Sequence, residues 1–129
     1  MEKLKFINEQ MEILEVPYEF GDEWTSKVTY PYFTGEITEI PTMSEDGYEE
    51  SEMILTGFHR GKGAWFELET IKNTIKKHFD PDYGLRASTD SGTIAVFFNG
   101  SFPVPTGEAE LKRVQINLLI KEWRKKGDM

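Results

Sequence analysis

Two histidines, His59 and His78, are the first residues to test for metal chemistry. A zinc site takes several cysteine, histidine or carboxylate ligands at spacings such as HExxH. The chain has no cysteine, and no such spacing surrounds either histidine. His59 falls in a glycine-bounded turn, and His78 falls in the basic last turn of an expected helix, where it complements the helix dipole. The sequence therefore predicts no metal site, and it excludes disulfide and thiolate chemistry.

A run of acidic residues over 41–52 is a second candidate, this time for a cation. It lacks the alternating D-x-D-x-D-G register of a calcium loop. A solvated acidic connector with a turn at Asp46-Gly47 is therefore the favoured interpretation.

Nucleotide binding and acyl-transfer chemistry find equally little support. Gly61-Lys62-Gly63 precedes an expected helix, but it is too short for a phosphate-binding loop and no Ser or Thr follows the lysine. No serine stands in a G-x-S-x-G frame. We expect no enzyme activity and no cofactor.

Composition predicts one globular domain over residues 1–129, with 38% hydrophobic and 13% aromatic residues. Fifteen basic residues against twenty-three acidic ones give a net charge of −8, which argues against a sequence-reading nucleic-acid binder. A protein that DNA must slide past is still compatible with that charge. The first residues are charged throughout and no long apolar run follows, so we expect no signal peptide, no membrane span and a cytoplasmic location.

The elements that hold these residues are organised around a long alternating stretch, 110–123. Four apolar residues fall on one side of an extended chain: Val114, Ile116, Leu118 and Ile120. Four polar residues fall on the other, with only Leu119 as an exception: Arg113, Gln115, Asn117 and Lys121. Because strand side chains alternate between faces, this stretch predicts the longest strand of a sheet.

Two segments have helical periodicity. Residues 3–15 place Leu4, Ile7, Met11 and Leu14 on one face, and residues 64–79 place Trp65, Leu68, Ile71, Ile75 and Phe79 on one face. We expect both helices to pack against the apolar side of the long strand.

The other strands are shorter. Residues 27–40 and 52–58 predict a long hairpin arm over about 27–58, in which Pro31 and Gly35 mark an edge, a bulge or a break. Residues 85–89 and 93–99 predict two more strands, and a proline-containing loop is expected from Asn99 to the long strand. The predicted fold class is α+β: a single mixed, mostly antiparallel sheet with two helices on one face.

Aromatic residues are more numerous than such a sheet can bury. Segment 93–98 is apolar on both faces, and two helices cover only one face. We infer that another subunit covers part of the other face, although a monomer with a curled sheet is an alternative. Aromatic enrichment is typical of buried interface cores.

Five segments carry a resemblance to a known family: 6–24 (FINEQMEILEVPYEFGDEW), 27–40, 50–58, 64–80 and 88–123 (STDSGTIAVFFNGSFPVPTGEAELKRVQINLLIKEW). They resemble the small tail-completion (tail-terminator) proteins of long-tailed phages and prophages of Gram-positive bacteria. The resemblance covers almost the whole chain. It rests on the order of the helices and strands and on the local sequence of each segment, not on a short diagnostic motif. It implies an α/β subunit of a hexameric ring that caps the tail tube and meets the head connector. It implies no catalytic residue.

The resemblance also implies partners and a location. The partners would be further copies of the chain, the major tail-tube protein and the head–tail connector proteins, with DNA passing through the lumen unbound. The location would be the head-proximal end of the virion tail, after assembly in the host cytoplasm.

Two groups of residues are candidates for these roles. The predicted subunit interface contains Tyr30, Tyr32, Phe33, Phe102 and Val104, together with Arg113 and Lys121 on the polar side of the long strand. The predicted lumen-facing acids are Glu45, Asp46, Glu49, Glu50, Glu108 and Glu110. For each, the alternative is ordinary core packing or a solvated surface position.

Two other functions stay open at this point. The chain would serve equally as a head–tail connector component or a minor tail-tube protein, since these are also small acidic ring formers. A small enzyme or ligand-binding module of a stress or toxin system would need a pocket with convergent polar groups.

Overall fold

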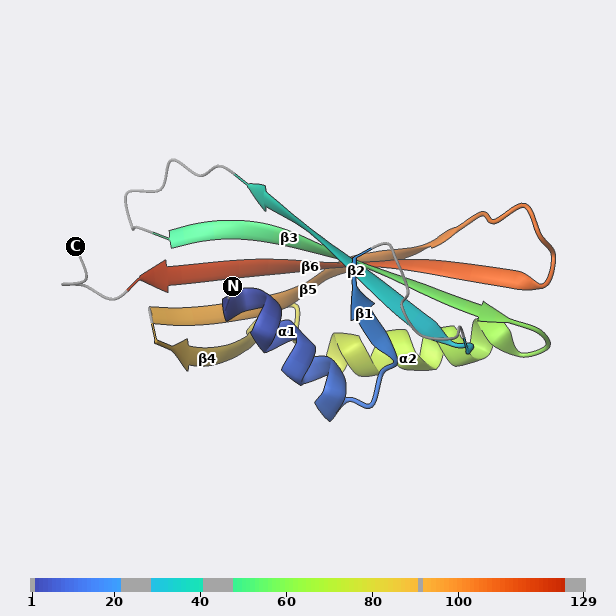
Figure 1. The fold of residues 1–129 in the computed structure, drawn as a ribbon, viewed down its shortest axis with the longest axis horizontal. Coiled ribbons are helices and arrows are strands. Elements are labelled where there is room, and N and C mark those ends of the chain that lie inside the picture. The colour runs from blue at the N-terminus through green and yellow to red at the C-terminus, as the bar shows by residue number, and fades with distance from the viewer. Residues whose placement is uncertain (1, 22–28, 41–47, 91, 125–129) are drawn as a thin grey trace.

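A computed structural model describes residues 2–21, 29–40, 48–90 and 92–124. Two helices and six strands make up this part of the chain (Figure 1): α1 (Glu2–Ile13), β1 (Tyr18–Phe20), β2 (Tyr32–Ile40), β3 (Tyr48–Arg60), α2 (Ala64–His78), β4 (Leu85–Thr89), β5 (Gly92–Val104) and β6 (Leu111–Arg124).

All six strands form one sheet in the order β1-β2-β3-β6-β5-β4. Only the β1–β2 pair is parallel. The predicted α+β class with a mixed, mostly antiparallel sheet is therefore confirmed. The predicted long strand is β6, which lies between β3 and β5 and pairs with both over most of its length.

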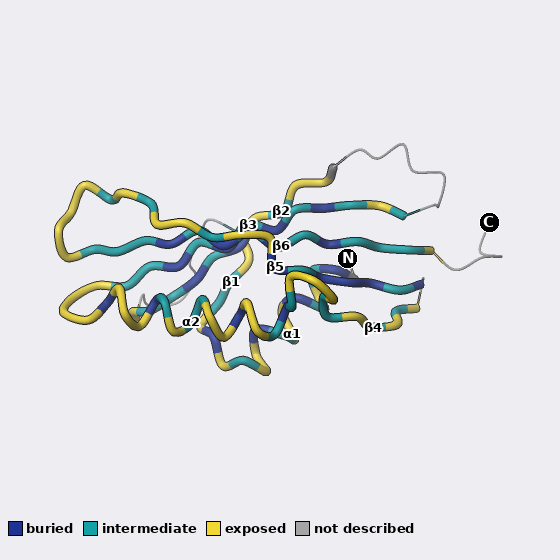
Figure 2. Tube along the Cα trace, turned by 180° about the vertical axis from the view of Figure 1, so that it is seen from behind, coloured by how far each residue is buried: buried dark blue, intermediate teal, exposed yellow. Residues whose placement is uncertain are grey.

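The two sides of β6 differ as the alternation predicts. Val114, Ile116, Leu118 and Ile120 are almost fully buried and belong to one core cluster with the helix residues Ile7, Met11, Leu68 and Ile75. Along the tube of Figure 2, buried and half-buried residues alternate on the strands, and exposed residues recur along the outer side of the helices. Both helices thus pack on one face of the sheet.

Trp65 is not part of the buried stripe of α2, contrary to the sequence prediction. The stripe starts from Ala64 and continues through Leu68 and Ile75 to Phe79. Trp65 is one residue, about 100°, further round the helix. Its side chain is 37% exposed as a result.

The predicted hairpin is present as β2 and β3, paired from Tyr32–Phe58 to Ile40–Glu50. Residues 27–28 and the tip, 41–47, lie outside the described residues. β3 is longer than predicted and pairs with β6 from end to end, so the hairpin is an integral part of the sheet. β1, which the sequence did not predict, adds in parallel to β2 at Phe33–Gly35.

β5 is also longer than predicted and continues to Val104, through about the first half of the expected proline loop. A register shift lies between Phe98 and Ser101. β4 pairs with β5 only as far as Val96, so the later part of β5 is an edge among the described residues. Pro103 fits there because an edge position does not need to donate a second ladder hydrogen bond.

Candidate assembly surface

The sheet has one face without a helix, which we call the open face. It is formed by the even-numbered side chains of β2, β3 and β4 and by the odd-numbered side chains of β6 and of β5 up to Phe97, since the opposite parity packs on the helices. Among the described residues, no helix side chain belongs to it. The described residues therefore place no second layer over this face.

Apolar side chains run across the centre of the open face. Ile54, Phe58, Phe97, Leu119 and Trp123 are each half-buried, and Leu119 and Phe97 are direct neighbours across β6 and β5. Leu119, which breaks the alternation in the sequence, is therefore part of an apolar patch. Burying these side chains beneath a partner would be favourable by roughly 25 cal/mol per Å² of apolar surface.

Cations lie over the aromatic rings of this face. Lys121 Nζ is 5.6 Å from the ring centres of both Tyr48 and Phe97. Arg86 is 6.0 Å from the ring of Phe97 and 5.9 Å from that of Trp123. These are cation–π distances, and such contacts strengthen when a partner removes water from them.

One row across four strands joins three of the predicted interface residues. Tyr32 faces Phe58, Phe58 faces Arg113, and Arg113 faces Val104. Tyr32 stacks on Phe58 at 5.0 Å, and the Arg113 guanidinium lies 5.9 Å from the same ring. Burial, and then the neighbouring Tyr30, raise the pKa of Tyr32 above its usual value. Phe58, at the centre of the row, is the member that sequence reasoning missed.

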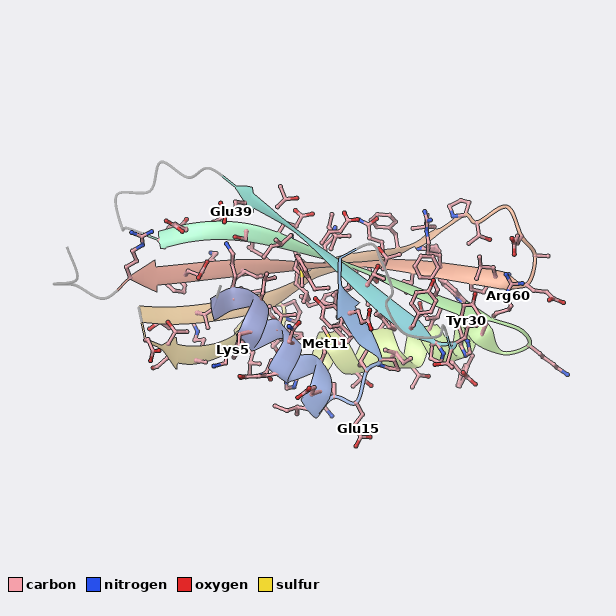
Figure 3. All side chains as sticks on the ribbon, viewed as in Figure 1. Lys5, Met11, Glu15, Tyr30, Glu39 and Arg60 are labelled. Atoms are coloured by element: carbon pink, nitrogen blue, oxygen red, sulfur yellow. The ribbon has the colours of Figure 1, made fainter. Side chains whose placement is uncertain are left out.

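The remaining predicted interface residues take different positions. Tyr30 lies beside this row, 5.6 Å from the Tyr32 ring, with the Arg60 guanidinium 5.9 Å above it (Figure 3). Phe102 is 47% exposed and faces Gln115. Lys121 belongs to the other end of the open face.

Phe33 corrects the prediction. Its side chain is 0% exposed and packs in the core with the helices. Tyr32 and Phe33 are adjacent in one strand and must point to opposite faces, so only one of them is available to a partner. The sequence alone does not say which.

The predicted lumen acids do not form one cluster. Glu49 and Glu50 lie at the start of β3, whereas Glu108 and Glu110 lie in the β5–β6 connection at the opposite end of the sheet (Figure 1). Glu45 and Asp46 are outside the described residues.

Two of the predicted lumen acids, Glu49 and Glu108, have ion-pair partners. Glu49 bonds the Arg124 guanidinium at 3.0 Å on the helix side of the sheet, and Glu108 bonds Arg60 at 2.7 Å. Glu50 lies on the open face, opposite Lys121 in the β3–β6 register. Glu110 is exposed, and its carbonyl accepts a hydrogen bond from the backbone of Gly61.

A wide, apolar hollow of about 850 Å³ lies between α2 and the β5–β6 connection. Trp65, Pro103, Pro105 and Leu111 contribute to its wall. Glu108, Lys112 and Arg113 are charged residues of the same wall. The hollow offers shape and apolar contact area.

Each histidine contacts a polar side chain of another element or turn. His59 Nε2 contacts the Glu67 carboxylate, and His78 Nε2 lies 2.7 Å from the amide oxygen of Gln10. Within the described part of the chain, no three histidines and carboxylates come together as a metal site would require, and no helix has the length and apolarity to cross a membrane.

No known family model and no curated protein matches this sequence.

Proposed function

We propose that this chain is a structural subunit of a phage tail: a tail terminator that forms a ring on the head-proximal end of the tail tube and provides the surface for head joining. The resemblance described above supports the tail role. The open face supports the role of an assembling subunit.

The open face is the observation that carries the proposal. It combines half-buried apolar side chains and aromatic rings with cations above them, and no helix in the described part of the chain covers it. Interface cores are enriched in aromatic residues and arginine in the same way. A subunit of this kind gains stability when it is placed against a neighbour, because apolar surface is then removed from water.

The net charge of −8 supports a ring through which DNA passes. Phosphate contacts with lysine and arginine produce salt-dependent retention of DNA, so a ring with an excess of acids would release DNA readily. The acids at both ends of the sheet fit this role without any specific nucleic-acid contact.

The test is addition of the purified chain to tail tubes assembled in its absence, followed by electron microscopy. We expect a ring of density at one end of each tube and tubes of uniform length when the chain is present during assembly. Tubes that stay unoccupied, or tails of normal length from a phage that lacks the gene, would contradict the proposal. A label found only on the head side of the joint would instead support a connector protein.

A further inference from the structure

Each of the two outer edges of the sheet has a stretch of similar length without a neighbouring strand among the described residues. β4 is the last strand on one side. On the other side, β1 covers only Phe33–Gly35 of β2, so residues 36–40 have no strand beside them among the described residues. Each free edge is five residues long. Unpaired N–H and C=O groups on such edges are a template for pairing with another chain.

The two free edges run in the same direction. The pairs β2–β3, β3–β6, β6–β5 and β5–β4 are all antiparallel, so four reversals bring β4 back to the direction of β2. A second copy placed beside the first by rotation about an axis that runs along the strands would therefore set β4 against β2 as a parallel pair. β1 already pairs with β2 in this parallel manner.

Charge distinguishes this arrangement from its alternatives. Glu36 is exposed on the free half of β2, and Arg86 is exposed on β4, both on the open face. A two-fold contact between like edges would bring glutamate towards glutamate or arginine towards arginine. A head-to-tail contact brings Glu36 to Arg86, and opposite charges on neighbouring strands stabilise a sheet.

The register that aligns Glu36 with Arg86 also brings apolar side chains together on the helix side of the sheet. It places Ile37 beside Ala87, and both side chains already pack against the core cluster on the helix side. It places Thr38 beside Ser88 on the open face. Since a shift of one residue would turn apolar side chains to the wrong face, the side-chain pattern favours this register.

We infer that β4 of one copy adds in parallel to residues 36–40 of β2 in the next copy, so that the sheet continues from subunit to subunit. The inference rests on the proposed function, because a head-to-tail contact closes into a ring only when its rotation divides a full turn, and the ring is part of that proposal. It identifies the subunit contact as a backbone pairing with one charge pair, Glu36 with Arg86.

The absence of cysteine from the sequence allows a direct test by disulfide trapping. Thr38→Cys and Ser88→Cys place sulfurs at facing positions of the proposed pair, where Cα atoms are within disulfide range. The two single variants, mixed and oxidised, are expected to give a heterodimer. A chain that carries both substitutions is expected to give a ladder of multimers on a non-reducing gel. Thr38→Cys with Lys77→Cys, on an exposed position of α2, is the matched control and should give no ladder.

Charge exchange tests the same contact independently. Glu36→Lys and Arg86→Glu should each weaken trapping by about two- to fivefold, as expected for one cross-strand charge pair. The double exchange in one chain should restore it, because the opposite charges meet again. Homodimers of a single-cysteine variant that form as readily as the heterodimer would overturn the inference in favour of a two-fold contact.

The outcome also separates this inference from the proposed function, since the trapping is done both on the free chain and on the chain added to tail tubes. Rings on tube ends without the 38–88 cross-link would overturn the strand pairing and leave the tail role standing. A ladder without addition to tubes would support the pairing and contradict the tail role. Absence of both rings and ladder would contradict both.

Discussion

The ring of Phe33 on β2 lies directly over Gly57, the residue that faces it on β3. A Cβ atom at position 57 would overlap this ring. Phe33 has no exposed surface, so it has little room to move aside. The missing side chain at position 57 is therefore what allows a phenylalanine to fill the core at this point.

We expect Gly57→Ala to destabilise the protein by about 1–3 kcal/mol, the usual cost of overfilling a core. Phe33→Leu combined with Gly57→Ala should cost less than the sum of the two single changes, because the smaller side chain makes room for the methyl group. Urea unfolding of the four proteins measures this coupling. Simple additivity would show that the two residues do not compete for space.

Lys3 forms a second contact that connects distant elements. Only 4% of the residue is exposed, and Nζ donates to Ser51 Oγ at 2.9 Å and to Glu39 Oε1 at 3.1 Å. Glu122 Oε1 is 3.5 Å away. One ammonium group thus connects α1 to three strands of the sheet.

Lys3→Met should lower the free energy of unfolding by about 1–3 kcal/mol, because buried Ser51 loses a charged hydrogen-bond partner. Lys5→Met removes the same charge from an exposed position two residues further along α1 (Figure 3) and should change stability by no more than about 0.5 kcal/mol. Equal effects of the two substitutions would assign the loss to helix charge rather than to the buried contact.

Hydrophobic periodicity predicts the helices and strands that are long enough for the pattern of apolar residues to repeat several times. The alternation of β6 and the apolar stripe of α1 each identify their own buried face, so Ile116 and Met11 were placed correctly. Trp65 shows the limit of the helical pattern, since a neighbouring position such as Ala64 can occupy the buried face instead.

Contacts between distant segments were not accessible to the same reasoning. β1 has only three residues and becomes a strand by pairing with β2, so Tyr18–Phe20 carries no pattern of its own. The row through Phe58 depends on the register of four strands. Pro103 argued for a loop, and it lies in a strand only because that part of β5 is an edge.

His78 predicts a dependence of stability on pH. Its Nε2 lies 2.7 Å from Gln10 Oε1 on α1, and burial lowers the pKa of His78 below its usual value. In the unfolded chain the imidazole takes up a proton at about pH 6.5, whereas the folded protein resists protonation until the pH is lower. The unfolded state therefore binds more protons in that window, and the stability present above pH 6.5 is lost as the pH falls through it.

The measurement is the free energy of unfolding between pH 5 and pH 8, compared with that of His78→Gln. The variant should show a smaller decrease on acidification. His59→Gln is the control, because it removes the other histidine and leaves the contact between the two helices intact. A decrease of the same size in His78→Gln as in the unchanged protein would contradict the prediction.

Charge reversal on the open face tests whether this surface is used in assembly. Arg113→Glu removes the cation above Phe58, and Lys121→Glu removes the cation above Phe97 and places a carboxylate opposite Glu50. We expect each reversal to reduce addition to tail tubes by at least about tenfold, because a carboxylate buried beneath a partner without a counter-charge is costly.

The fold of these variants should persist, since the apolar side of β6 is unchanged. Circular dichroism and the thermal midpoint report on it, and an effect of about 1 kcal/mol would shift the midpoint by only several degrees. Lys77→Glu makes the same charge change on an exposed position of α2 and should leave assembly unaffected. If Lys77→Glu impaired assembly as strongly as Lys121→Glu, net charge rather than the open face would govern addition to the tube.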